Sequence, residues 1–128
     1  RITDLNYGGH LGNDRILTYA HEARVQFLSS LGYSEMNLEG LGVIMADAAI
    51  CFKNEAFYGE ILRIDISVAE VHKYGFDIFY QFVKQNNGAV VAIVKTGMLT
   101  FDYDLRKVKS LPENARAKFQ PRFPALDE

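Results

Sequence analysis

Residues 4–14 read DLNYGGHLGND and concentrate groups that could act on a polarised carbonyl. Gly8, Gly9 and Gly12 flank His10, and a long amphipathic segment follows at once. A helix N-terminus presents unpaired N–H groups and a partial positive charge, and glycine lets a ligand come close to the backbone. Amides near Gly9 and His10 are therefore expected to form an oxyanion hole.

This loop contains neither Ser nor Cys, so we expect water to be the attacking group. Asn, His or a carboxylate would position and activate that water. The candidates are Asn6, His10 and Asp14, with Glu22 two to three turns along the helix. No Gly-Lys-Ser/Thr follows the glycines, and the three histidines lack a metal-binding spacing, so neither a P-loop nor a metal site is expected.

Each candidate also has a structural interpretation, which stays open at this stage. Asp14 can simply be a favourable charge in the first turn of a helix. Glu22 can form a surface ion pair or belong to a dimer interface, and the glycines can serve turn geometry alone. Asp47, inside an apolar strand, needs a partner, which favours a site or interface role.

The helix that must position these groups is expected over residues 14–31. Its apolar residues recur at helical spacing, with Asn13 as N-cap and Gly32 just beyond the end. The apolar positions of that helix are Ile16, Ala20, Ala23, Phe27 and Leu31. Such a face requires a sheet or another helix to cover it.

Four antiparallel strands that form a meander are expected after the helix, over residues 42–53, 60–72, 75–85 and 89–103. Alternation assigns four residues of the second strand to one face and four residues of the third to one face: Leu62, Ile64, Ile66 and Val68 in the second, and Phe76, Ile78, Tyr80 and Phe82 in the third. Asn87-Gly88 predicts a hairpin, and Gly97 a bulge or close approach. A fifth strand is expected in the run ending at Thr3. The predicted fold is α+β, a single domain of residues 1–128. It has one long central helix wrapped by a curved antiparallel sheet of about five strands, and a tail from about 107 draped on the surface.

Composition limits the class of protein. The 128 residues carry a net charge of −2, which does not attract nucleic acid, and no apolar run reaches the length of a membrane span. Cys51 is the single cysteine, so no internal disulfide can form; we expect it to be a small core residue and the location to be cytoplasmic. The basic residues of 106–109 predict a solvated patch or, alternatively, a contact with phosphates.

Taken together, the loop, helix and strands resemble the hotdog-fold acyl-CoA thioesterases, in the branch of the 4-hydroxybenzoyl-CoA thioesterases. That family opens with D-x-D-x-x-G-H-x-N-N, which here reads DLNYGGHLGN, followed by Glu22, Arg24 and the Leu31-Gly32 pair. The segment 57–71 is similar to the family's G-D-x-L-x-V strand, with Glu60 in place of Asp. The resemblance covers residues 1 to about 112.

This resemblance implies a homodimer, and often a tetramer, with the active site at the dimer interface and the acyl chain in a tunnel between two helices. It implies no cofactor, since CoA is part of the substrate. Many members use the second Asp of D-x-D as nucleophile or base, but Asn6 stands there in this chain. An amide cannot take a proton from water, so the base is expected at Asp14 or Glu22, with His10 as third candidate.

The expected function is hydrolysis of an acyl-CoA or acyl-carrier-protein thioester to acid and thiol. The missing carboxylate at Asn6 favours a non-catalytic acyl-thioester binding module as the alternative. A dehydratase acting on hydroxyacyl thioesters is the third interpretation, with His10 and Asp14 facing one substrate carbon.

Overall fold

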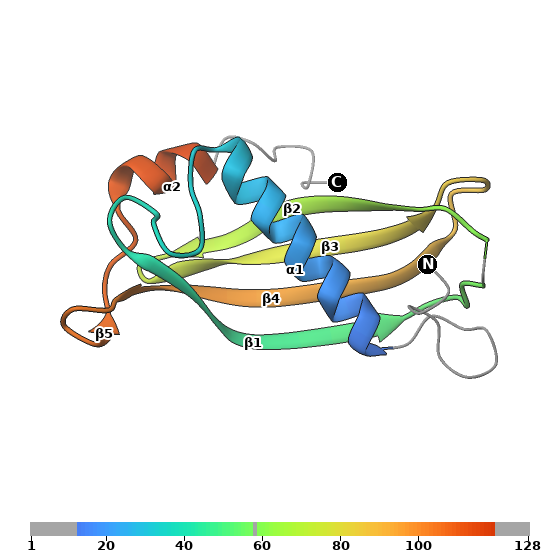
Figure 1. The fold of residues 1–128 in the computed structure, drawn as a ribbon, viewed down its shortest axis with the longest axis horizontal. Helices are drawn as coiled ribbons and strands as arrows, with labels where there is room; N and C mark the ends of the chain where they lie inside the picture. Colours follow the sequence, from blue (N-terminus) through green and yellow to red (C-terminus); the bar gives the residue numbers. More distant parts are fainter. Residues whose placement is uncertain (1–12, 58, 120–128) are drawn as a thin grey trace.

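The computed structural model describes residues 13–57 and 59–119 as two helices and one antiparallel sheet (Figure 1). The strands follow the order β1-β4-β3-β2, and the short β5 pairs with the end of β4. The elements are α1 (Asn13–Ser30), β1 (Gly42–Phe52), β2 (Leu62–His72), β3 (Gly75–Lys84), β4 (Val90–Asp102), β5 (Lys107–Val108) and α2 (Glu113–Phe119). The predicted α+β class and antiparallel sheet of five strands are confirmed.

Helix α1 confirms the helix expected over residues 14–31, with its bounds moved by one residue. It ends in a Schellman motif: the N–H of Gly32 donates to Ser29 O and the N–H of Tyr33 to Leu28 O. Gly32 has a φ of 87°, a conformation that glycine adopts without steric cost. The glycine after the last apolar residue therefore marked the end of the helix correctly.

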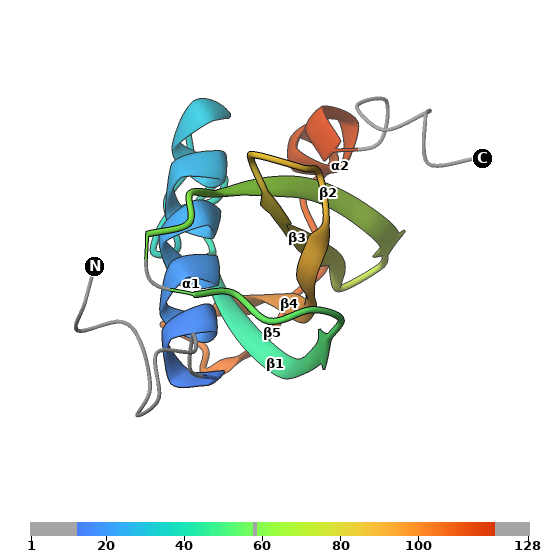
Figure 2. The ribbon, with the colours of Figure 1, turned by 90° about the vertical axis from the view of Figure 1, so that its right-hand side faces the viewer.

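Helix α1 lies along one face of the sheet (Figure 2), with Ile16, Ala20 and Leu28 buried against it. The opposite side of the helix is open, since Leu17 and Val25 are exposed. The described strands thus cover one side of α1, whereas the sequence predicted a helix wrapped by the sheet.

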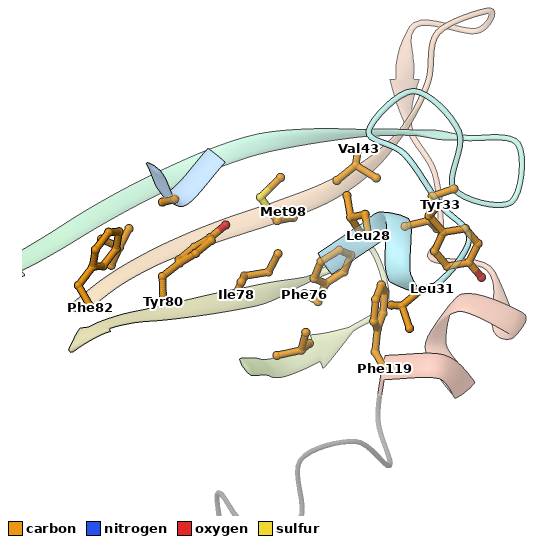
Figure 3. Packing of buried hydrophobic residues seen from close by; sticks show 14 of the residues in the cluster. Leu28, Leu31, Tyr33, Val43, Phe76, Ile78, Tyr80, Phe82, Met98 and Phe119 are labelled. Atoms are coloured by element: carbon orange, nitrogen blue, oxygen red, sulfur yellow. The ribbon is translucent and has the colours of Figure 1, made fainter. Parts of the chain in front are cut away.

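The core forms between α1 and the inner face of the sheet (Figure 3). Alternate residues of β3 point into it, and all four are almost fully buried: Phe76, Ile78, Tyr80 and Phe82. These are the residues predicted to share a face, so the register of the most buried strand was readable from its alternation. Leu28 of α1 and Leu31, directly after the helix, lie over the Phe76 end of this row (Figure 3).

Strands β2, β3 and β4 form the predicted meander, joined at one end by the two-residue turn Lys73-Tyr74. The β3–β4 hairpin is also confirmed, with Gly88 at a φ of 75°, and its loop holds the five residues 85–89. Strand β1 does not continue the meander; it pairs with β4 at the other side of the sheet. The long connection 53–61 allows this, because only a tight turn would oblige β1 and β2 to be neighbours.

The tail from 107 is a correction to the sequence analysis, because up to residue 119 it is not draped on the surface. Leu111, Ala115 and Phe119 are buried in the core, and the Phe119 ring lies 4.4 Å from that of Phe76. Lys118 Nζ donates to Leu31 O at 3.0 Å, at the end of α1. A seven-residue helix shows too little periodicity to be recognised, and burial of Phe119 fixes it instead.

Two further predictions concern the sheet edges. Cys51 is exposed, contrary to the expected core position, because it points to the outer face of an edge strand that no described element covers. The strand predicted to end at Thr3 lies outside the described residues, and the fifth strand that the structure describes is β5.

Candidate active site

The predicted site residues fall into two groups. Asn6, Gly9 and His10 lie outside the described residues, and so does the side chain of Asp14, whose backbone belongs to the first turn of α1. Glu22 lies in the middle of the same helix, and its side chain is described.

Helix α1 begins at Asn13, directly after the glycine loop. Its first-turn N–H groups have no carbonyl partner inside the helix, and the helix dipole adds partial positive charge there. The structure thus confirms a helix that begins directly after the glycine loop, and the oxyanion hole near Gly9 and His10 stays a prediction.

Asp14 and Glu22 lie on the same helix, Asp14 in its first turn and Glu22 in its middle. Eight residues separate them along α1, which corresponds to about 12 Å of helix axis. A general base must be within about 3.2 Å of the group whose proton it takes. Which of the two carboxylates could reach a given water depends on the side chain of Asp14, which lies outside the described residues.

Glu22 lines an open groove of about 510 Å³ between α1 and β2. One wall is a helical stripe at the spacing i, i+3, i+4: Tyr19, Glu22, Ala23, Gln26, Phe27 and Ser30. The other wall is the half-buried inner face of β2, with Leu62, Ile64 and Ile66. Its volume lies in the range of small-molecule sites, but the groove is open to solvent and its lining is about as polar as it is apolar.

Sequence reasoning missed this groove, although its signal was present in two places. The alternation of Leu62, Ile64 and Ile66 was assigned to a common face, and the stripe from Tyr19 to Ser30 has the helical period. Only the three-dimensional structure shows that the two faces diverge enough to leave a groove rather than a closed core.

A polar network holds α1 in place one turn from the groove. The guanidinium of Arg24, only 6% exposed, donates from Nε to Glu35 Oε2 at 2.7 Å and from Nη1 to Tyr80 Oη at 2.9 Å. Tyr80 Oη lies 2.8 Å from Thr96 Oγ1, so the network crosses from the helix to the central strands of the sheet. His21 joins this network, because its Nε2 lies 3.0 Å from Glu35 Oε1.

Electrostatics in this network favour the charged forms. Burial alone would raise the pKa of Glu35, but hydrogen bonds from Arg24 and His21 outweigh it and leave that pKa below the ordinary 4.5. Burial likewise would lower the pKa of Arg24, and its bonds to Glu35 and Tyr80 raise it instead. Arg24 is thus a fixed cation that sets the position of α1.

Asp47 has an ion-pair partner, as expected for a carboxylate inside an apolar strand. Its Oδ1 accepts from Lys95 Nζ at 2.8 Å and from the Gly97 N–H at 3.1 Å, beside an irregularity of β1 between Met45 and Asp47. Gly97 is thus a point of close approach, as predicted, because a Cβ there would lie 2.8 Å from Asp47 Oδ1. The carboxylate is exposed on the sheet and forms an ion pair there.

The basic segment 106–109 lies at the other end of the molecule from the start of α1 (Figure 1). A contact between these side chains and a ligand at the N-terminus of α1 in the same chain is therefore not favoured. Glu60 closes the turn before β2: its Oε1 accepts from the Phe57 N–H at 2.8 Å, and its Oε2 lies 3.2 Å from Lys84 Nζ.

Two features are absent from the described part of the chain. Within residues 13–57 and 59–119, no group of three His, Cys, Asp or Glu side chains is arranged to hold a metal ion. None of the helices in these ranges combines the length and apolar character needed to cross a bilayer.

With this fold and groove established, comparison with known proteins identifies the class. The model of the thioesterase-like superfamily matches residues 1–119, and the chain belongs to that family. A protein of Aquifex aeolicus (strain VF5) named "Putative esterase" is 26% identical over 107 residues, covering 82% of this chain and 80% of that protein.

Solved structures show the same fold. A 1,4-dihydroxy-2-naphthoyl-CoA thioesterase from Synechocystis superposes with a TM-score of 0.81 at 21% identity, covering 92% of this chain and 88% of the other. A gentisyl-coenzyme A thioesterase superposes with a TM-score of 0.79 at 22% identity, covering 93% and 94%. The resemblance predicted from the loop, helix and strands is thereby confirmed at the level of family and fold.

Proposed function

We propose that this protein hydrolyses an acyl-CoA or acyl-carrier-protein thioester to a carboxylic acid and a thiol. The observation that carries the proposal is the family match over residues 1–119 together with a helix that begins directly after the glycine loop. That arrangement offers backbone donors to a developing oxyanion, which typically contribute a few kcal/mol in acyl transfer.

The proposed reaction has four steps. Amides near Gly9 and His10 polarise the thioester carbonyl, while Asn6 orients the water or that carbonyl. A carboxylate, Asp14 or Glu22, removes a proton as the water oxygen bonds to the carbonyl carbon. The tetrahedral intermediate then collapses, the carbon–sulfur bond breaks, and the thiolate takes up the proton. His10 remains the third candidate for the base.

A CoA thioester is the favoured substrate class. Two structural neighbours are named for CoA thioesters of hydroxylated aromatic acids, and a third is a thioesterase complexed with coenzyme A. We extend the CoA carrier to this chain as part of the proposal. The exposed thiol of Cys51 fits a reducing cytoplasm, where unpaired thiols persist.

We also propose a homodimer, with tetramers as a further level of assembly. Strand β1 is paired only with β4 in the described part of the chain, and its second edge is open. Most of its residues from Met45 to Phe52 are exposed. An open edge of this kind is suited to pairing with the same strand of a second copy.

Thiol release from a panel of acyl-CoAs tests the proposal. The wild-type protein should release free thiol from at least one short, long or aromatic substrate, and no release from any of them would overturn it. Asp14→Asn and Glu22→Gln should differ: the variant lacking the base should lose about 10²- to 10⁴-fold in kcat. Glu113→Gln, at an 88% exposed carboxylate on α2, is the matched control and should keep full activity.

A non-catalytic acyl-thioester binding module is the second candidate, and Asn6 in place of the family's aspartate is the observation that favours it. Calorimetry that detects binding of a CoA thioester without any turnover would support the binding module over the hydrolase. A dehydratase would instead convert a 3-hydroxyacyl-CoA to the enoyl product, which is detected by its absorbance.

A further inference from the structure

The groove between α1 and β2 leaves apolar surface uncovered among the described residues. Its β2 wall consists of Leu62, Ile64 and Ile66, which pack against the core and remain half buried. Burying these side chains further is favourable, because it removes apolar surface from water. A segment that covers this wall would therefore stabilise the fold.

The last described helix leads to this groove. Helix α2 ends at Phe119, whose fully buried ring stacks on that of Phe27 with a centroid distance of 6.4 Å and an interplanar angle of 23°. Phe27 itself lines the groove. Lys118 Nζ donates to Leu31 O at 3.0 Å, which holds α2 beside the end of α1 (Figure 1). The residues that follow Phe119 in the sequence therefore start next to the groove.

The groove extends from Phe27 in two unequal directions along α1. Toward the end of the helix it reaches Ser30, three residues away, which is about 4.5 Å of helix axis. Toward the start of the helix it reaches Tyr19, eight residues away, which is about 12 Å. An extended segment that starts beside Phe27 thus has room only in the direction of Tyr19.

Residues 120–128 have the composition and the reach to lie in that direction. They read QPRFPALDE, and Pro121 and Pro124 oppose continuation of α2 and favour an extended conformation. An extended chain of this kind rises about 3.1 Å per residue, so the four residues from Phe119 to Phe123 span about 12 Å. That span equals the length of groove available toward the start of α1.

Charge gives this placement a register. Among the described residues that line the groove, Glu22 is the single carboxylate, and none is Lys, Arg or His. Glu22 lies five residues from Phe27, or about 7.5 Å along α1. Arg122 lies three residues beyond Phe119, or about 9 Å in an extended chain. The Arg122 guanidinium therefore arrives at the level of Glu22, where the two opposite charges attract each other.

We propose that residues 120–128 dock in the groove between α1 and β2, with Arg122 paired to Glu22 and Phe123 packed on the apolar wall of β2. The proposal concerns a contact within one chain and does not rest on the proposed thioester hydrolysis. It has a consequence for that reaction, because a Glu22 engaged by Arg122 leaves Asp14 as the favoured carboxylate for the general base.

Disulfide formation between introduced cysteines tests the contact. In the full chain carrying Cys51→Ser, Phe123→Cys is combined either with Tyr19→Cys in the groove or with Val25→Cys, at an exposed position outside it. Under mild oxidation the Tyr19 pair should form a disulfide within the chain at least tenfold faster than the Val25 pair. The reason is that docking brings only the first pair of Cα atoms within about 4.4–6.8 Å. Mass spectrometry of unreduced peptides measures both rates, and circular dichroism checks that each variant is folded.

Equal rates for the two cysteine pairs would overturn the proposal, because they would show that the segment has no preferred position on α1. Disulfides that form mainly between two chains would overturn it as well, and would indicate that a second copy occupies the groove.

Coupling between the two charges supplies a second measurement that leaves the apolar contacts intact. In urea unfolding, the effects of Glu22→Gln and Arg122→Gln on the equilibrium constant should be coupled by a factor of about two to five, as for accessible ion pairs. Glu22→Gln combined with Lys107→Gln is the control and should show no coupling, because Lys107 is exposed on β5 and outside the groove. Absence of coupling between Glu22 and Arg122 would overturn the proposed pairing. Neither measurement depends on hydrolysis, so failure of the proposed function and failure of this inference are distinguishable.

Discussion

Removing the hydroxyl of Tyr80 should destabilise the protein much more than the loss of a single oxygen atom suggests. The side chain of Tyr80 is fully buried, and Tyr80→Phe keeps its volume, so the change creates no cavity. It removes two contacts: the bond from Arg24 Nη1 at 2.9 Å and the bond with Thr96 Oγ1 at 2.8 Å. All of the loss is therefore polar.

The magnitude follows from these two bonds. A hydrogen bond to a charged group contributes about 1.5–3 kcal/mol, and a neutral one about 1 kcal/mol. Arg24 is 6% exposed and Thr96 is buried, so neither gains a full water partner in exchange. We expect Tyr80→Phe to lower the free energy of unfolding by about 2–4 kcal/mol, a large share of the 5–15 kcal/mol typical of domains.

Urea unfolding monitored by circular dichroism measures this change. Tyr74→Phe is the matched control, because it removes the same hydroxyl from an exposed ring and should cost less than about 0.5 kcal/mol. In a double-mutant cycle, Thr96→Val should cost about 1 kcal/mol in the wild type and clearly less in Tyr80→Phe. A loss below 0.5 kcal/mol for Tyr80→Phe would refute the reasoning that this network holds α1 on the sheet.

Two further predictions test the network and the C-terminal helix. Burial would raise the pKa of Glu35, but hydrogen bonds from Arg24 and His21 hold it below 4.5; protonation therefore favours the unfolded chain. The stabilisation from Glu35 is fully present above about pH 4.5 and is lost as the pH falls through the lowered pKa. Urea unfolding at a series of pH values should therefore show that the free energy of unfolding falls less steeply with acid in Glu35→Gln than in the wild type. Phe119→Ala should lower the free energy of unfolding by about 3–5 kcal/mol because its ring is fully buried, whereas Leu105→Ala, at an exposed position, should change it by less than about 0.5 kcal/mol; a small effect of Phe119→Ala would show that α2 is not part of the core.

Local features of the fold were readable from the sequence because each depends on neighbouring residues. The helical spacing of apolar residues predicted α1, and Gly32 predicted its end. The alternation of residues in β3 predicted which face of that strand is buried. Among the candidate site residues, Glu22 was placed correctly on α1, but the sequence did not show that it faces β2.

The features that were not predicted depend on residues far apart in the chain. Cys51 was expected in the core, and its exposure follows from the edge position of β1, which is decided by pairing with β4. The tail was expected on the surface, but Phe119 packs against Phe76 and covers that end of the core, which removes apolar surface from water. Neither fact has a local signal.

The sequence by itself determined the α+β class, the helix that follows the glycine loop, the main strands and the resemblance to thioesterases. Each of these is encoded in side-chain periodicity or in a short motif, within one element. Only the tertiary structure decided the strand order, the burial of Arg24 and the groove beside Glu22. Those depend on how separate elements pack, since a groove is the space that two faces fail to fill and no single stretch of sequence contains it.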